Sequence, residues 1–313
     1  MFINFYKNKN YKIYWELSKP DITLLVIITA FFGYYAGMIS IDTDNQIIWK
    51  DVIFLITGVA LSSAGVSTLN GYIESNLDKK MKRTLNRPIP SGKISSNKAL
   101  LFGLSVSISG VLDLYYFISP LAGILSFITL FLYLVVYTPL KQKTEWNTII
   151  GAIPGALPPI GGWVAATGEI NFGAWIFFAL LFAWQIPHFI AIAWLYKDDY
   201  KSAGYKMITT GDNIDSKIKY YIGIFSILVL IFSIMPSFMG LSGIFYLIGT
   251  FIISFYLLRK SYQMIINQNR KNARKLLFAT IIYYPALLIN FFSLLRRYKK
   301  IKNEMNKNDS KFN

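Results

Sequence analysis

The sequence contains no cysteine and only one histidine, His188. A chain without cysteine forms no disulfide framework, binds no metal through thiolates and has no cysteine nucleophile. The absence of cysteine also means that the sequence does not indicate whether the compartment is oxidising or reducing, because disulfide usage is the feature that would do so. We expect no cleaved signal peptide, because the first 20 residues are polar and basic and the first apolar run has full spanning length.

Charged residues are also scarce, at 15% of the chain, whereas hydrophobic residues make up 54%. With a mean hydropathy of +0.42, the chain is too apolar for an ordinary soluble domain. None of the 32 lysine and arginine residues lies in an apolar run, and each run has close to the ~20 residues that cross a bilayer as a helix. The runs are 22–40, 52–72, 99–117, 121–138, 149–167, 174–195, 220–236, 241–258 and 276–295. The pattern predicts an all-α polytopic membrane protein, with about nine transmembrane helices bundled around a central cavity.

The basic residues are distributed unevenly between the two ends of these runs. Most lie in the N-terminal segment and in alternate loops, while the intervening connections hold only Lys50. The positive-inside rule therefore places the N-terminus and those loops, 73–98, 139–148, 196–219 and 259–275, in the cytoplasm. The tail 296–313 is basic too, yet nine spans place it outside. Either the rule is weak for this last segment or one run does not span, and we favour nine spans.

The net charge of +16 is mostly juxtamembrane, which is typical of topology signals and anionic lipid headgroups. We therefore expect the lipid bilayer as a partner and no nucleic acid. We also expect one transmembrane domain over 1–313, with a core of about 15–295 and the basic polar tail 296–313. The setting we expect is a cell membrane, in a prokaryote.

A polar motif follows the second apolar run, where Asn70, Glu74 and Asp78 recur at every fourth residue. On a helix these side chains share one face and rise by about 12 Å. Two carboxylates at the mouth of a membrane helix are costly to bury unless a cation meets them. A run of basic residues follows at once, so the motif predicts a site for Mg²⁺ and a phosphorylated ligand. A solvated helix end is the alternative.

A second acidic loop follows the sixth run and contains Asp198 and Asp199. It is cytoplasmic by the same charge argument, so both acidic clusters open to one side of the membrane. Spans two and six would then form one cavity, with carboxylates facing each other across its rim. Taken alone, Asp198 and Asp199 also fit solvated loop charges.

The first motif resembles the N-x-x-x-(D/E)-x-x-x-D element of the UbiA-type intramembrane prenyltransferases. Its longer form, N-x-x-x-E-x-x-x-D-x-x-M-x-R-T-x-x-R-P-x-P-S-G over 70–92, resembles the heme-farnesylating branch of that family. The resemblance covers roughly 15–295 and is specific. Its other matches are Tyr137, Thr138, Lys141, Thr144, Asn147, the stretch 151–163, Thr167, Gly168, the segment Trp184-Gln185-Ile186-Pro187-His188-Phe189, and Asp199, Tyr200, Ala203 and Gly204.

The resemblance implies transfer of a farnesyl group from farnesyl diphosphate to a vinyl group of heme B. It implies Mg²⁺ as cofactor and, downstream, heme-modifying or oxidase-assembly proteins as partners. The residues it implies fall into three sets. The catalytic and metal-binding set is Asn70, Glu74, Asp78 and Asp199, with Mg²⁺ held by the three acids; the diphosphate-binding set is Lys82, Arg83, Arg87 and Lys141; the heme-binding residue is His188.

One departure from the wider family is the lack of a second D-x-x-x-D. The positions four residues from Asp198 and Asp199 are Trp194, Leu195, Ser202 and Ala203. The heme-farnesylating branch is similar in this respect, so the departure supports the narrower resemblance. It leaves open how many carboxylates this loop supplies to a metal.

Alternatives remain for His188 and for the function. A lone histidine in a helix is often a hydrogen-bonded core residue, although an axial imidazole suits a protein that accepts heme and has no cysteine. A related prenyltransferase acting on a quinone precursor would share the Asn70–Asp78 motif without needing the His188 segment. A membrane transporter would also be polytopic, but here the polar groups gather at one face.

Overall fold

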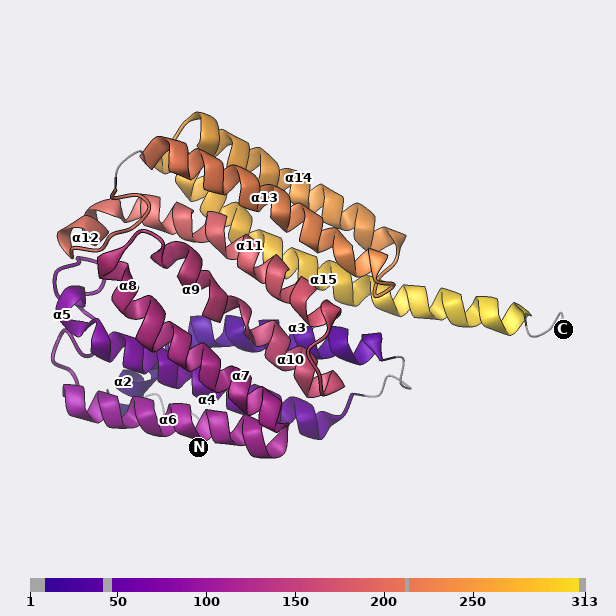
Figure 1. Cartoon of the computed structure of the whole chain (residues 1–313), viewed down its shortest axis with the longest axis horizontal. Coiled ribbons are helices and arrows are strands. Elements are labelled where there is room, and N and C mark those ends of the chain that lie inside the picture. Colours follow the sequence, from indigo (N-terminus) through magenta and orange to yellow (C-terminus); the bar gives the residue numbers. More distant parts are fainter. Residues whose placement is uncertain (1–8, 42–46, 212–213, 310–313) are drawn as a thin grey trace. The chain divides into compact units, whose positions relative to one another are not determined.

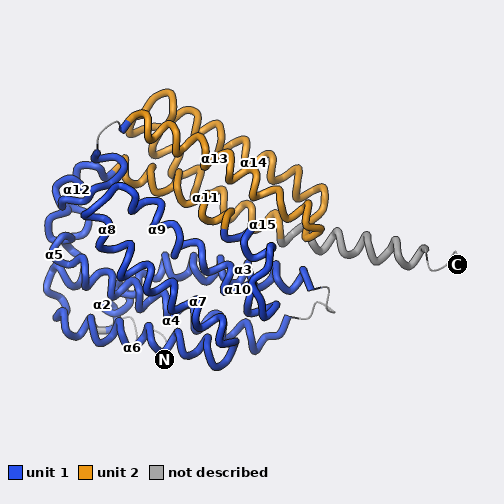
Figure 2. The backbone as a smooth tube through the Cα atoms, viewed as in Figure 1, with its two compact units in different colours: residues 1–178, 196–214 blue, residues 179–195, 215–313 orange. Residues whose placement is uncertain are grey.

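A computed structural model gives the backbone of residues 9–41, 47–211 and 214–309, and the side chains of 11–41, 47–211 and 214–291 (Figure 1). Over these ranges every regular element is helical, which confirms the predicted all-α class. The chain forms two compact units (Figure 2). Unit 1 comprises 1–178 and 196–214, and unit 2 comprises 179–195 and 215–313. The single domain over 1–313 stays a prediction.

Eight helical segments of the described chain are long and apolar enough to cross a membrane. The ninth predicted run, 276–295, lies within helix α15, Arg270–Asp309, so the expected count of about nine is consistent with the structure. The eight segments are Pro20–Ser40 (α3), Trp49–Ile73 (α4), Ser96–Phe117 (α6), Pro120–Lys143 (α7 to α8), Asn147–Thr167 (α9 and α10), Phe172–Leu195 (α11), Ile214–Phe238 (α13) and Ile244–Ile266 (α14). Among the described residues there are also three short helices, Lys9–Leu17 (α2), Ser75–Asp78 (α5) and Lys197–Ser202 (α12).

Small residues let the helices of unit 1 approach closely. A Cβ at Gly162 of α10 would overlap the Ala30 carbonyl of α3, and one at Gly65 of α4 would overlap Ser107 of α6. Figure 1 shows α4 and α6 running side by side. In lipid, helices gain little from the hydrophobic effect when they associate, so close van der Waals contact has to hold them together.

Two of the predicted runs are not continuous α-helices. The fourth consists of α7, Pro120–Phe131, the π-helix η1, Leu132–Tyr137, and α8, Thr138–Lys143. The fifth is divided at Leu157 into α9, Asn147–Ala156, and α10, Pro158–Thr167. Pro158 has no N–H to continue the ladder, which explains the second break. The π-helix is of interest because such segments occur frequently at functional sites.

Hydrogen bonds between side chains tie the helices of unit 2 together. The Tyr283 hydroxyl of α15 lies 2.8 Å from Ser233 Oγ of α13 and 2.9 Å from Ser254 Oγ of α14. Tyr246 of α14 donates to the Ser233 carbonyl at 2.7 Å. These buried polar groups satisfy one another, which an apolar medium requires.

Candidate active site

The motif residues Asn70, Glu74 and Asp78 do not lie on one uninterrupted helix. Helix α4 ends at Ile73, and Glu74, with φ −86° and ψ −1°, separates it from α5. Backbone bonds from Glu74 to Asn70 and from Asp78 to Glu74, each 2.9 Å, keep the helical spacing across this break. All three side chains are buried, with exposures of 2%, 6% and 0%. Their burial excludes the solvated helix end as an explanation of the motif.

Each buried carboxylate has a cationic partner. Arg87 Nη1 donates to both oxygens of Asp78, at 3.0 and 2.8 Å. Lys141 Nζ of α8 donates to Glu74 Oε1 at 2.7 Å. Thr84 Oγ1, which bonds the Asp78 carbonyl at 2.9 Å, holds the turn that returns Arg87 to the motif. Arg87 and Lys141, both predicted to bind diphosphate, therefore contact the predicted metal ligands Asp78 and Glu74.

Aromatic rings set the position of Lys141. Its ammonium lies 4.4 Å from the centroid of the Tyr137 ring, at the end of the π-helix η1. Tyr133, one turn earlier, packs edge-on against Tyr137 with centroids 5.1 Å apart. A Cβ at Gly151 of α9 would overlap the Tyr137 ring, so glycine at this position makes room for it. The Tyr137, Lys141 and Gly151 positions of the sequence pattern thus form one local arrangement.

The second acidic loop contacts the basic run that follows the first motif, within unit 1, while the predicted cavity with carboxylates facing each other across its rim stays a prediction. The Arg83 guanidinium lies 4.9 Å from the Tyr196 ring centroid, within cation–π range. Ser202 Oγ donates to the Lys80 carbonyl at 3.2 Å, and the backbone N–H of Lys206 donates to the Lys141 carbonyl at 2.8 Å. The loop after α11 is therefore anchored to the basic run and to α8.

Three residues singled out in the sequence lie farther from close contact with Glu74 and Asp78. Asp199, in α12, is half-buried, while Asp198 is exposed. No three acidic or histidine side chains in the described part of the chain lie close enough together to hold one metal ion, so Asp199 does not join Glu74 and Asp78 in such a group. Lys82 is exposed and forms no ion pair among the described residues.

Lys19 is a site residue that sequence reasoning missed. It has φ 44° and ψ 67°, which makes it the only described non-glycine residue with positive φ, immediately before Pro20. Burial and the Arg87 guanidinium lower the pKa of Lys19 to about 8, although the Glu74 and Asp78 carboxylates act in the opposite direction. Such backbone outliers gather at functional sites. The one available signal was a lysine just before the first apolar run, which is too common to interpret.

The electrostatics of the site keep Glu74 ionised. Burial raises the pKa of the Glu74 carboxyl, but the charge and hydrogen bond of Lys141 outweigh burial, so this pKa lies below its ordinary value. Burial and the Glu74 carboxylate raise the pKa of Tyr205 above its usual range, so its hydrogen bond with Glu74 comes from a neutral phenol. Glu74 therefore remains an acceptor with negative charge at neutral pH.

The residues present fit a magnesium ion and a phosphate compound. Mg²⁺ takes hard oxygen ligands, and Glu74 and Asp78 supply buried carboxylates one turn apart. Asn70 is buried beside them, and its side-chain hydrogen bond with Glu74 helps to lower the pKa of that carboxyl.

His188 lies on α11 in unit 2 and is half-buried. Its Nδ1 lies 2.9 Å from Thr280 Oγ1 of α15, and its ring stacks on Trp184 with centroids 5.1 Å apart. The hydrogen-bonded histidine anticipated as the alternative is therefore present. Among the residues that the structure describes, only Nδ1 of this ring has a hydrogen-bond partner, which leaves Nε2 as the nitrogen for a ligand.

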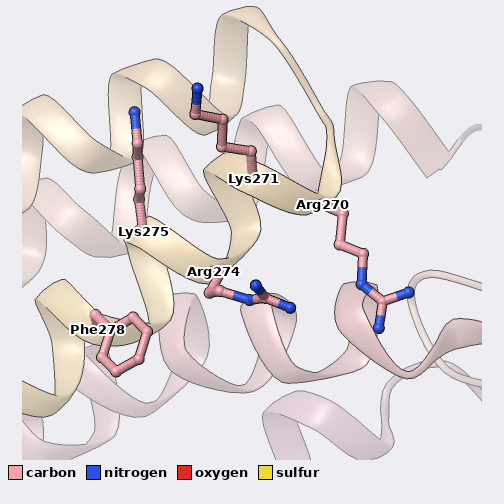
Figure 3. A pocket seen from close by; sticks show the side chains of 5 residues that line it. All are labelled: Arg270, Lys271, Arg274, Lys275 and Phe278. Carbon is pink, nitrogen blue, oxygen red and sulfur yellow. The ribbon is translucent and has the colours of Figure 1, made fainter.

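A cavity of about 390 Å³ lies at the start of α15, and none of the residues that line it is a predicted site residue. In Figure 3 its two arginines extend to one side of the helix and its two lysines to the other. It contains no acidic residue and is therefore not the predicted metal site. Its lining residues are Arg270, Lys271, Arg274, Lys275 and Phe278.

Comparison with known proteins connects this geometry to a family. Residues 26–311 match the model of the UbiA prenyltransferase family. The chain is 36% identical over 280 residues to Protoheme IX farnesyltransferase of Solibacter usitatus, which covers 88% of this chain and 95% of that one. It is 33% identical over 278 residues to the mitochondrial Protoheme IX farnesyltransferase of Arabidopsis thaliana, covering 88% of this chain and 63% of that one.

Solved structures share the fold at lower identity. A structure described as a digeranylgeranylglyceryl phosphate synthase in membranes has a TM-score of 0.76 and 19% identity, over 92% of this chain and 99% of that one. A UbiA homolog from Archaeoglobus fulgidus bound to GPP and Mg²⁺ has a TM-score of 0.56 and 14% identity, over 91% and 99%. Together with the buried carboxylate motif, these matches establish that the chain belongs to the UbiA prenyltransferase family.

Proposed function

We propose that this protein transfers the farnesyl group of farnesyl diphosphate to a vinyl group of protoheme IX (heme B), releasing diphosphate. The observation that carries the proposal is the set of two buried carboxylates, each held by a cation, at the motif where the family signature lies. The Protoheme IX farnesyltransferases of two organisms, similar over 88% of this chain, support heme as the acceptor.

Glu74 and Asp78 would hold Mg²⁺, with Asn70 beside them. We propose Asp199 as a further ligand, which requires its half-buried side chain to turn toward Glu74. When bound, Mg²⁺ supplies positive charge to the diphosphate oxygens. The chain's own cations add to this charge, with Arg87 and Lys141 inside the site and Arg83 and Lys82 at its exposed rim. Asn70 would help to keep the Glu74 carboxylate ionised through its side-chain hydrogen bond.

The reaction begins as the bond between C1 of the farnesyl group and the diphosphate oxygen breaks, with its electron pair leaving on oxygen. Arg87 and Lys141 would stabilise this developing charge, because they are already oriented by Asp78 and Glu74. The vinyl π bond of heme B attacks the allylic cation. Water then captures the new cation and loses a proton, giving a hydroxyethylfarnesyl side chain.

We propose that His188 contacts the heme, since it is the only imidazole in the chain and lies in a membrane helix. We also propose that the protein lies in the cell membrane with its N-terminus and both acidic loops in the cytoplasm, as the basic loops indicate. Downstream heme-modifying or oxidase-assembly proteins would receive the product.

The proposal is tested with membranes containing the protein, incubated with heme B, farnesyl diphosphate and Mg²⁺. Mass spectrometry of the extracted heme should show one added farnesyl group and one added hydroxyl group. Prenylation of an aromatic quinone precursor with heme left unchanged would replace this function with the quinone branch. Movement of intact farnesyl diphosphate across the membrane without any product would indicate a transporter.

A further inference from the structure

Thr280 of α15 holds two residues of the Trp184–Phe189 segment at once. Trp184 Nε1 donates to the Thr280 carbonyl oxygen at 2.9 Å, and His188 Nδ1 lies 2.9 Å from Thr280 Oγ1. Trp184 and His188 are one helical turn apart on α11, and their rings stack with an interplanar angle of 16°. Trp184 and Thr280 are also fully or almost fully buried. The imidazole is therefore fixed in position by a ring on one side and a hydroxyl at its edge.

The protons at this contact can be counted. Thr280 Oγ1 carries one proton and donates it to the Leu277 carbonyl at 2.7 Å. While Oγ1 donates to this carbonyl it meets His188 as an acceptor, so Nδ1 carries the hydrogen and donates it. In the opposite tautomer, Oγ1 would turn its proton to Nδ1 and give up the bond to Leu277. The two short contacts of Oγ1 together therefore favour hydrogen on Nδ1.

The tautomer with hydrogen on Nδ1 sets the state of the other ring nitrogen. In a neutral imidazole with hydrogen on Nδ1, Nε2 has a free lone pair. Nε2 forms no hydrogen bond among the described residues, and the side chain is half-buried rather than enclosed. A neutral imidazole whose second nitrogen donates to a fixed acceptor is the usual form of a histidine that binds a metal.

We propose that Thr280 is a positioning residue that holds His188 in the Nδ1–H tautomer, with Nε2 directed to the iron of a bound iron porphyrin. The inference rests on the proposed heme-prenylating function and deepens it. It also assigns a role to Trp184, since its indole fixes the plane of the imidazole. Without Thr280 the ring could rotate or exchange tautomers, and a fraction of the molecules would present N–H instead of a lone pair.

The tautomer is measured first, on the wild-type chain. Because His188 is the only histidine, labelling with ¹⁵N-histidine gives signals from this side chain alone. In heme-free protein, the nitrogen chemical shifts should show hydrogen on Nδ1 and a bare Nε2. Hydrogen on Nε2 would overturn the proposal without any variant, so the test does not depend on how a substituted chain folds.

The second experiment titrates heme into purified full-length variants and follows the Soret spectrum. Thr280→Val removes the acceptor and should weaken heme binding by roughly 10- to 100-fold, with a spectrum shifted toward that of His188→Ala. Thr280→Ser keeps the hydroxyl and should restore the wild-type spectrum. Thr129→Val is the matched control, since within the described part of the chain the Thr129 hydroxyl bonds only the Leu125 carbonyl of its own helix. Protection against thermal unfolding by farnesyl diphosphate confirms folding of each variant.

The possible results distinguish three claims: the role of Thr280, ligation of heme by His188, and farnesylation of heme. A wild-type spectrum in Thr280→Val, together with an altered one in His188→Ala, overturns the role of Thr280 and leaves heme contact in place. An unchanged spectrum in His188→Ala overturns ligation itself. Farnesylated heme from Thr280→Val at reduced rate, rescued by Thr280→Ser, is the result we expect. Absence of farnesylated heme from the wild-type protein would instead refute the proposed function.

Discussion

Lys141 Nζ lies 2.7 Å from Glu74 Oε1, although 67 residues separate them in the sequence. Arg87 pairs with Asp78 in the same site, so each buried acid is neutralised by its own cation. Breaking such a pair leaves an uncompensated charge in a medium of low polarity, which is costly. The cations therefore have two roles, to stabilise the carboxylates in the folded chain and to meet the diphosphate during the reaction.

Glu74→Gln or Asp78→Asn should reduce farnesyl transfer on the order of 100-fold or more while leaving folded protein in the membrane. Each change keeps the shape and removes one negative charge from a site whose metal needs hard oxygen ligands. Turnover at saturating Mg²⁺ is the measurement. Near-normal activity in both variants would show that the metal-site assignment is wrong.

Arg87→Ala should raise the farnesyl diphosphate concentration needed for half-maximal rate and should destabilise the protein by about 2 kcal/mol. This is less than the cost of breaking a fully buried pair, because the Arg87 side chain is 30% exposed. Adding Asp78→Asn should restore stability but not activity. Heme affinity should stay unchanged, and an equal loss of heme affinity would point to contact with a heme propionate instead.

Lys19 should give the site a dependence on pH near 8. Its pKa of about 8 means that the ammonium loses its charge as the pH rises through that value, so affinity for farnesyl diphosphate should fall between pH 7 and about 9. Stability should change in the opposite sense. Between about 8 and 10.5 the unfolded chain binds more protons than the folded one, so the free energy of unfolding rises.

Lys19→Arg keeps the charge at these pH values and should remove the fall in affinity. Lys19→Met should show weak, pH-independent affinity throughout. Isothermal titration with farnesyl diphosphate at a series of pH values makes the comparison. A wild-type profile in Lys19→Met would mean that another group titrates.

Gly151→Ala should lower activity by about tenfold and destabilise the chain by ~1–3 kcal/mol, because the new methyl group would displace Tyr137 and with it Lys141. Gly161→Ala in α10 is a matched control, since a Cβ there meets no described residue within 4 Å. It should be neutral or gain a few tenths of a kcal/mol from helix propensity. Comparable losses in the two variants would argue against the Tyr137 contact as the cause.

The sequence predicted the membrane helices well for a physical reason. Backbone groups in lipid must bond within their own helix, so apolar runs of spanning length have few alternatives. The Asn70–Asp78 spacing likewise predicted a buried acidic site, because two carboxylates beside an apolar run need partners. The pairing of Glu74 with Lys141 was not predicted, because the family pattern indicated Lys141 only as a diphosphate-binding residue and no local signal connects residues 67 apart.

Other features depended on tertiary contacts and could not be read from the sequence. The apolar pattern of 121–138 is the same whether its end is an α-helix or the π-helix η1, which depends on packing. The left-handed backbone of Lys19 contradicts local preference, and only the surrounding fold can impose it. Thr280 was an ordinary residue of an apolar run until its two bonds to Trp184 and His188 were seen.

The most direct test of the account follows isotope-labelled farnesyl diphosphate with the purified protein, heme B and Mg²⁺. We expect label in the heme fraction from wild-type protein and at least roughly 100-fold less label from Glu74→Gln. Removal of Mg²⁺ with a chelator should abolish labelling of the heme, and adding Mg²⁺ back should restore it. Label that stays with farnesyl diphosphate or its hydrolysis product in wild-type protein, or transfer that continues in Glu74→Gln, would contradict farnesylation of heme at this site.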